Sequence, residues 1–336
     1  MLPVGAMILF LNGVPDCNAD ERSTPSNGNG LNVGAIRMQL PPLDLSQAHS
    51  QPEAIGAYRR FYRLDFENIR HYIGRFMSGE MAIAGQVFLP HRPVGTFFLM
   101  HGYFDHTGTL RNLIAACLEK GFAVAVFDLP GHGLSSGDRG AIDDFSQYAS
   151  VLREFINAYA EDLPKPFHLT AHSTGCAGAY EYMNHATTIV FERIVFLAPL
   201  VRHAHWRISS IGYHLAKPFA DTLPTMNRRN SSDEAFLEFT RNDPLRNSHL
   251  SIRFLDALHE WNRSIQHYKI ISKPVLVIQG TDDGVVDWKY NVDFLQSKII
   301  GMAVELVDAA KHQLINENQQ LRQRVFDRLF EYVENR

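Results

Sequence analysis

Short apolar segments recur along the chain between residues 96 and 309, and stretches with helical spacing separate most of them. Nearly continuous apolar runs of this kind are typical of strands that are covered on both faces of a sheet. Upstream, residues 71–90 predict two further strands joined by a Ser-Gly-Glu turn. The six later segments are TFFLM (96–100), FAVAVFDL (122–129), FHLTA (167–171), RIVFLAP (193–199), PVLVIQG (274–280) and AVELVDA (303–309).

Three intervening stretches place apolar residues at helical spacing and predict amphipathic helices. They cover Thr109–Lys120, Asp143–Tyr159 and about Asn316–Val333. Alternation of strands with helices predicts an α/β fold, in which a mostly parallel central sheet carries helices on both faces.

One interval, residues 201–271, contains no strand candidate and several helix-like stretches. Because a structureless connection of that length would be unusual in a compact domain, we expect an inserted helical cap there. The expected organisation is a core of residues 54–200 and 272–336, interrupted by the cap. Residues 1–53 are rich in polar and turn-forming residues after an apolar start, and we expect a flexible N-terminal tail.

The composition is that of a globular protein, with 45% hydrophobic and 20% charged residues among 336. A formal net charge of −4 gives no electrostatic reason to expect a nucleic-acid partner. Three cysteines, Cys17, Cys117 and Cys176, fit reduced thiols better than a disulfide framework, which favours a cytoplasmic location. The alternative is export through a weak N-terminal signal, although the first basic residue is only Arg22.

The stretch FHLTAHSTGCAGAY, residues 167–180, places Ser173 between a strand-like segment and a run of small residues. A serine at a sharp strand-to-helix turn is the context of the nucleophile elbow, whose pattern is Gly-x-Ser-x-Gly. Ala171 replaces the first glycine here, while Gly175 keeps the second. Since alanine adds only one methyl group, we interpret the elbow as intact.

A serine nucleophile needs a base that takes its proton and an acid that orients the base. Asp282 and Asp283 follow the predicted strand that ends at Gly280, and His312 follows the last predicted strand. The order Ser, Asp, His along the chain is the order that this architecture requires. At most one of the two adjacent aspartates can face His312, because successive side chains leaving a strand point in opposite directions.

An oxyanion hole requires backbone N–H groups that point at the developing negative charge. The strand TFFLM runs directly into His101-Gly102, so the N–H of Tyr103 is one expected donor. The N–H of Thr174, the residue after the serine, is the other.

Taken together, these motifs resemble the α/β-hydrolase family, most closely its monoacylglycerol lipase and lysophospholipase group, which includes proteins described as serine aminopeptidases. HGYFDHTG, FDLPGHGLSSGDRG, QGTDDGVVD and KHQLINE agree with four separated motifs of that group in the right order. The resemblance places the triad acid three positions after Gly280, at Asp283, and we then expect Asp282 to face solvent or to cap the turn. Asp287 is expected to cap the following helix.

The resemblance implies a serine hydrolase that cleaves acyl-glycerol or lysophospholipid esters through an acyl-enzyme on Ser173. Thioesterase, peptidase and carbon–carbon bond hydrolase remain alternatives on the same triad, as does a catalytically silent binding protein. The expected partners are a small ester or lipid substrate and, transiently, a membrane surface that the cap contacts. No cofactor or metal is expected, and the sequence leaves the oligomeric state open.

Overall fold

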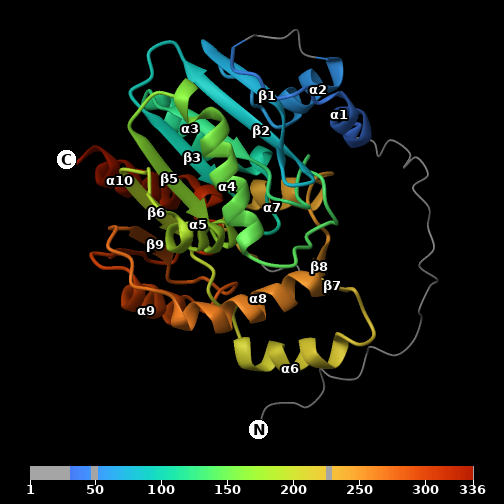
Figure 1. The fold of residues 1–336 in the computed structure, drawn as a ribbon, viewed down its shortest axis with the longest axis vertical. Helices are drawn as coiled ribbons and strands as arrows, with labels where there is room; N and C mark the ends of the chain where they lie inside the picture. Colours follow the sequence, from blue (N-terminus) through green and yellow to red (C-terminus); the bar gives the residue numbers. More distant parts are fainter. Residues whose placement is uncertain (1–30, 47–51, 225–228, 336) are drawn as a thin grey trace.

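The computed structural model describes residues 31–46, 52–224 and 229–335. An eight-stranded sheet of order β1-β2-β4-β3-β5-β6-β9-β10 forms its centre (Figure 1). Strand β2 pairs antiparallel with β1 and β4, and all other neighbours in this sheet are parallel, which confirms the predicted mostly parallel sheet. The strands are β1 (Ile69–Ser78), β2 (Met81–Pro90), β3 (Thr96–Met100), β4 (Ala123–Phe127), β5 (Phe167–His172), β6 (Arg193–Leu197), β9 (Leu276–Gly280) and β10 (Ala303–Val307).

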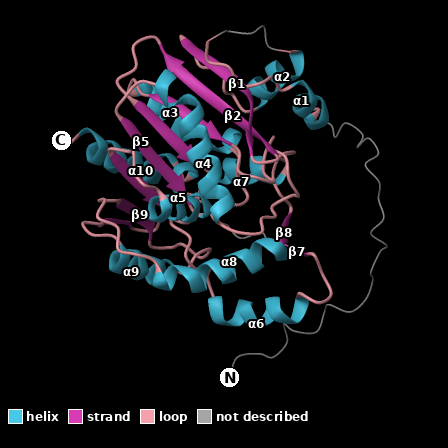
Figure 2. Ribbon diagram, viewed as in Figure 1, coloured by secondary structure: helices cyan, strands magenta, loops and turns pink. Residues whose placement is uncertain are grey.

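Helices cover both faces of this sheet, as Figure 2 shows. Successive residues of a strand point to opposite faces, so Phe97 and Leu99 of β3 enter one apolar cluster while Phe98 and Met100 enter the other. The first cluster includes side chains of α3 (Arg111–Glu119) and α10 (Gln319–Glu334). The second includes side chains of α4 (Ser146–Tyr159), α5 (Thr174–His185) and α9 (Trp288–Lys298). Short 3-10 turns are η2 (Thr107–Leu110), η3 (Ala160–Asp162), η4 (Ile265–His267) and η5 (Leu314–Asn316).

The chain between β6 and β9 forms an insertion at one end of the molecule, with α6 lying alongside α8 on its outer side (Figure 1). It contains the expected helices, and also an antiparallel pair of strands that the sequence analysis did not predict. Each of these strands has three residues, too few to show an alternating pattern. The elements are α6 (Trp206–Ala216), β7 (Thr222–Pro224), α7 (Glu234–Arg241), β8 (His249–Ser251) and α8 (Ile252–Ser264).

The expectation of a flexible tail over residues 1–53 is wrong for residues 31–46. Helix α1 (Val33–Gln39) is capped by the side chain of Asn32, and its residue Ile36 is fully buried. The chain then adds to the outer edge of β1, where Leu43 N–H donates to the Arg75 carbonyl at 2.9 Å. Helix α2 (Glu53–Phe61) follows. Residues 1–30, with Cys17 and the candidate signal, and residues 47–51 lie outside the described residues.

Candidate active site

Ser173 lies between the last residue of β5 and the first residue of α5, with φ +51° and ψ −114°. A positive φ is strained for a residue with a side chain, and such strain clusters at functional sites. The turn depends on Gly175, because a Cβ there would approach the carbonyl oxygens of Met100 and His101 to 2.6 and 2.8 Å. Ala171 is buried beside Met100 in the parallel register of β5 and β3. The chain thus makes the elbow with alanine in place of the first glycine.

The structure brings Ser173, His312 and Asp283 together from the ends of three strands. Ser173 Oγ lies 2.9 Å from His312 Nε2, and His312 Nδ1 lies 2.8 Å from Asp283 Oδ2. All three side chains are buried. This continuous chain of hydrogen bonds is the geometry in which an imidazole takes a proton from a serine hydroxyl.

The carboxylate of Asp283 is held by backbone and side-chain donors as well as by His312. Its Oδ1 accepts from the N–H groups of Val285 and Val286 at 2.8 and 3.2 Å, and its Oδ2 accepts from Gln279 Nε2 at 3.1 Å. Burial raises the pKa of Asp283, but attraction to His312 and these hydrogen bonds outweigh burial and hold the pKa below its usual value. The group therefore carries a negative charge at neutral pH.

The two other aspartates of this segment make different contacts. Asp282 is exposed, which agrees with the expectation that it faces solvent, and it pairs with the ammonium group of Lys311. Asp287 occupies the N-cap position of α9, but its side chain makes no capping hydrogen bond, so the expectation of a side-chain cap is wrong. Its backbone N–H donates instead to the carbonyl of Arg202 at 2.9 Å.

Tyr103 and Thr174, the two expected oxyanion donors, line the same cavity as Ser173. Thr174 is the first residue of α5, where backbone N–H groups have no partner within the helix and the helix dipole favours negative charge. The Tyr103 hydroxyl donates to the Gly140 carbonyl at 2.8 Å and accepts from Ser251 N–H at 2.9 Å. These two bonds fix the loop that carries the Tyr103 N–H.

A second buried carboxylate–imidazole pair, Asp105 and His172, lies beside His312 and was missed by sequence reasoning. His172 Nδ1 lies 3.3 Å from Asp105 Oδ2, and His172 Nε2 lies 3.1 Å from the His312 carbonyl oxygen. Gln313 donates to both Asp105 oxygens at 3.1 and 3.2 Å. Burial raises the pKa of Asp105, but these two partners outweigh burial and lower it. The arrangement anchors the backbone that carries His312.

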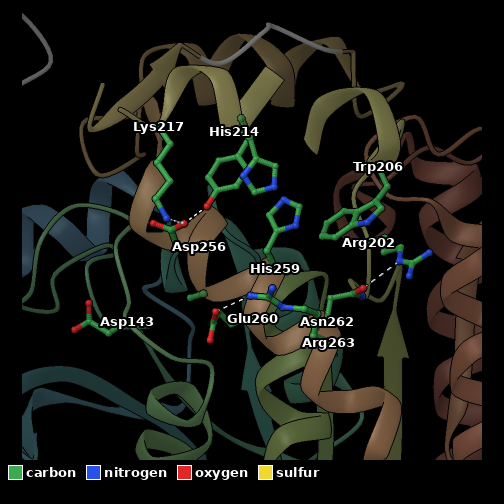
Figure 3. Close-up of a pocket in the computed structure, with 12 residues that line it drawn as sticks. Asp143, Arg202, Trp206, His214, Lys217, Asp256, His259, Glu260, Asn262 and Arg263 are labelled. Carbon is green, nitrogen blue, oxygen red and sulfur yellow. Dashed lines mark hydrogen bonds and ion pairs between the residues drawn. The ribbon is translucent and has the colours of Figure 1, made fainter. Parts of the chain in front are cut away.

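Ser173 and His312 line a cavity of about 430 Å³ whose walls include apolar side chains of the insertion. A larger cavity of about 620 Å³ lies between α6 and α8, lined by polar groups such as Arg202, Asp256 and His259 (Figure 3). Tyr213 lines both cavities, but no triad residue reaches the larger one. The smaller cavity is therefore the candidate substrate site. Its larger apolar residues from the insertion include Leu223, Phe236, Leu250, Phe254, Leu255 and Leu258.

Comparison with known families decides the classification. The sequence profile described as "Serine aminopeptidase, S33" matches residues 91–319, which include Ser173, Asp283 and His312. The chain belongs to this family. Structures with 17–18% identity support the same α/β-hydrolase fold. The chain matches a soluble variant of monoglyceride lipase from Saccharomyces cerevisiae with TM-score 0.66, over 77% of this chain and 93% of that chain. It matches monoacylglycerol lipase from Paleococcus ferrophilus with TM-score 0.63, over 75% of this chain and 99% of that chain.

Two curated relatives match this hydrolase over most of their length. Mouse monoglyceride lipase is 24% identical over 300 residues, which is 85% of this chain and 96% of the relative. Monoacylglycerol lipase from Mycolicibacterium smegmatis is 25% identical over 255 residues, 72% and 90% of the two chains. These matches confirm the resemblance to the monoacylglycerol lipase group, and they class the chain as a carboxylic ester hydrolase.

Proposed function

We propose that this hydrolase cleaves acyl-glycerol esters through an acyl-enzyme formed on Ser173. The observation that carries the proposal is the unbroken path of hydrogen bonds from Ser173 through His312 to Asp283, with distances of 2.9 and 2.8 Å. Serine alone is a weak nucleophile, and this path supplies both the base and the group that orients it.

In the proposed reaction, Ser173 Oγ attacks the ester carbonyl while His312 Nε2 takes the hydroxyl proton. The N–H groups of Tyr103 and Thr174 stabilise the negative charge on the carbonyl oxygen. Asp283 holds His312 in the tautomer with the proton on Nδ1 and stabilises the imidazolium. His312 then protonates the departing alcohol, and a water molecule activated by the same imidazole releases the acid and regenerates Ser173.

The shape and chemistry of the cavity support a substrate with an apolar acyl chain. Apolar groups line most ligand pockets, and a few polar groups orient the ligand. Here the insertion contributes apolar walls, while Ser173, His312 and Asn230 lie among the polar residues. The mouse and bacterial relatives named above are monoglyceride and monoacylglycerol lipases, which favours a glycerol ester. Lysophospholipid esters are the nearest alternative, followed by thioesters, amides and activated carbon–carbon bonds.

The outer face of α6 supports transient contact with a lipid surface. Ile208, Ile211 and Leu215 lie on one side of this helix and are 75%, 63% and 68% exposed. Phe219, just beyond the helix, continues the row and is 88% exposed. Exposed apolar rows of this kind mark interaction surfaces, including membrane surfaces. Among the residues that the structure describes, no helix is long and apolar enough to span a bilayer.

The proposal is tested by measuring kcat/KM for 1-octanoylglycerol, p-nitrophenyl octanoate, octanoyl-CoA and an octanoyl anilide. We expect turnover of both oxygen esters to exceed that of the thioester and the anilide. We also expect Ser173→Ala to lose on the order of 10⁴-fold or more in kcat. Preferred turnover of the anilide would instead support the peptidase alternative, and no turnover of any substrate would support a silent binding protein.

A further inference from the structure

A tight turn over residues 243–247, between α7 and β8, presents a basic side chain to the catalytic cavity. Asp243, Leu245 and Asn247 of this turn are buried, whereas Arg246 is only partly buried. The side chain of Arg246 lines the cavity that contains Ser173. Buried neighbours on both sides of Arg246 leave this turn little freedom to move.

Asp243 fixes the turn to the core of the molecule. Its Oδ2 lies 2.8 Å from His106 Nε2, and its Oδ1 accepts from the Tyr62 hydroxyl at 2.6 Å. The same Oδ1 accepts from Leu245 N–H at 2.9 Å, and the Leu245 carbonyl accepts from Arg139 Nη2 at 2.7 Å. Because Tyr62, His106 and Arg139 all belong to the core, the insertion is anchored where Arg246 projects.

Arg246 has no carboxylate partner among the described residues. Other arginines in the structure form ion pairs, as Arg253 does with Asp138 and Asp143, but no such pair involves Arg246. Its guanidinium lies 5.5 Å from the centre of the Phe104 ring, and Phe104 also lines the cavity. A fatty acyl chain placed against this group would remove water from an unpaired charge, which is unfavourable. The guanidinium therefore faces the non-acyl part of the substrate.

One carboxylate lies in the same cavity and does not neutralise Arg246. Asp105 accepts from Gln313 and contacts His172, so its oxygens are already engaged within the core. Among the described residues that line this cavity, Arg246 is then the one lysine or arginine side chain. In a partly closed apolar site, attraction between opposite charges is stronger than in water.

We infer that Arg246 selects esters whose alcohol carries an anionic oxygen group, a phosphate or a carboxylate. This inference rests on the proposed ester hydrolysis at Ser173 and names the substrate class for that site. The planar guanidinium offers parallel N–H donors that match two oxygens of a phosphate or carboxylate group. An acylated glycerol phosphate would place its acyl chain against the apolar walls and its phosphate against Arg246.

The test compares three octanoyl esters below their micelle concentrations: 1-octanoylglycerol, 1-octanoylglycerol 3-phosphate and the octanoyl ester of glyceric acid. For the wild type we expect kcat/KM to be higher for an anionic ester than for 1-octanoylglycerol, and the two anionic substrates separate phosphate from carboxylate recognition. Arg246→Gln should lower the anionic-to-neutral ratio of kcat/KM by about tenfold or more, the loss typical of a charge-assisted hydrogen bond. Arg246→Lys should retain part of the anionic-to-neutral ratio of kcat/KM, because lysine keeps the positive charge but lacks the two parallel N–H donors of the guanidinium.

Arg241→Gln is the matched control, because Arg241 is exposed in the last turn of α7 and does not line the cavity. We expect this variant to keep the wild-type ratio. The inference is overturned, while ester hydrolysis stands, if the wild-type anionic-to-neutral ratio of kcat/KM is one and Arg246→Gln does not change it. It is also overturned if Arg246→Gln lowers kcat/KM equally on all three esters. Failure of the wild type to hydrolyse any of these esters or p-nitrophenyl octanoate overturns the proposed function, and this inference with it.

Discussion

Replacing Asp283 with asparagine should remove nearly all turnover while preserving the shape of the side chain. In the wild type, Asp283 Oδ1 accepts from two backbone N–H groups, and Oδ2 faces His312 Nδ1. An asparagine would keep its oxygen toward the backbone donors and turn its NH₂ group toward His312. The imidazole would then carry its proton on Nε2, where it can no longer accept the proton of Ser173.

The magnitude follows from the role of the tautomer. The corresponding change in a serine protease lowers kcat by about 10⁴-fold, which corresponds to about 5.4 kcal/mol of transition-state stabilisation. Asp282→Asn is the matched control. Asp282 is 62% exposed and pairs only with Lys311 in the described structure, and exposed pairs contribute at most about 1 kcal/mol. This control should lose less than about tenfold.

The assay is kcat on saturating p-nitrophenyl octanoate, with Tm measured by circular dichroism to show that both variants are folded. A folded Asp283→Asn protein that retains more than about a tenth of wild-type kcat would refute the tautomer argument. A loss of similar size in Asp282→Asn would show that the segment as a whole, rather than Asp283, supports catalysis.

Three further predictions concern the elbow, the buried ion pair and the surface of α6. Gly175→Ala should reduce kcat by at least about 100-fold, since its Cβ would meet two carbonyl oxygens at 2.6 and 2.8 Å. Ala171→Gly should change kcat by less than about tenfold, and kcat of both variants is measured on the ester series. His106→Ala should cost about 3–5 kcal/mol in urea unfolding, because it leaves Asp243 charged and buried. Burial lowers the pKa of His106, but Asp243 and neighbouring carboxylates outweigh burial and raise it. The stabilisation by this pair is complete below about pH 6.5 and decreases as pH rises through the raised pKa of His106. The difference in the free energy of unfolding between wild type and His106→Ala should therefore become smaller as pH rises through that pKa. Ile211→Ser with Phe219→Ser should weaken sedimentation with phosphatidylcholine vesicles by about tenfold, because both side chains are exposed; unchanged sedimentation would exclude this face as the contact.

The residues that sequence alone placed best are those tied to strand ends. Ser173, Asp283 and His312 each follow a recognisable apolar strand, and in an α/β sheet the carboxyl ends of parallel strands meet at one edge. Their proximity could therefore be predicted although 139 residues separate Ser173 from His312. Choosing Asp283 over Asp282 required the family motif. The alternation of side-chain direction along a strand shows only that at most one of the two aspartates can face His312.

Features that depend on long-range packing had no local signal. His106 and Asp243 are 137 residues apart, and neither lies in a pattern that predicts the other as its partner. The helix at Val33–Gln39 was missed because its flanks are polar and turn-rich, although burial of Ile36 against the core stabilises it. Arg246 could not be distinguished from other basic residues, since only the folded insertion brings it to the cavity.

The most direct test of the central claim is to trap the acyl-enzyme and locate it. Wild-type hydrolase would be treated with a fluorophosphonate or rapidly quenched with p-nitrophenyl octanoate, and digested peptides would be examined by mass spectrometry. We predict one modified residue, Ser173, with no modification in Ser173→Ala and slow modification in His312→Ala. Modification of a different residue, or normal ester turnover by folded Ser173→Ala, would contradict it.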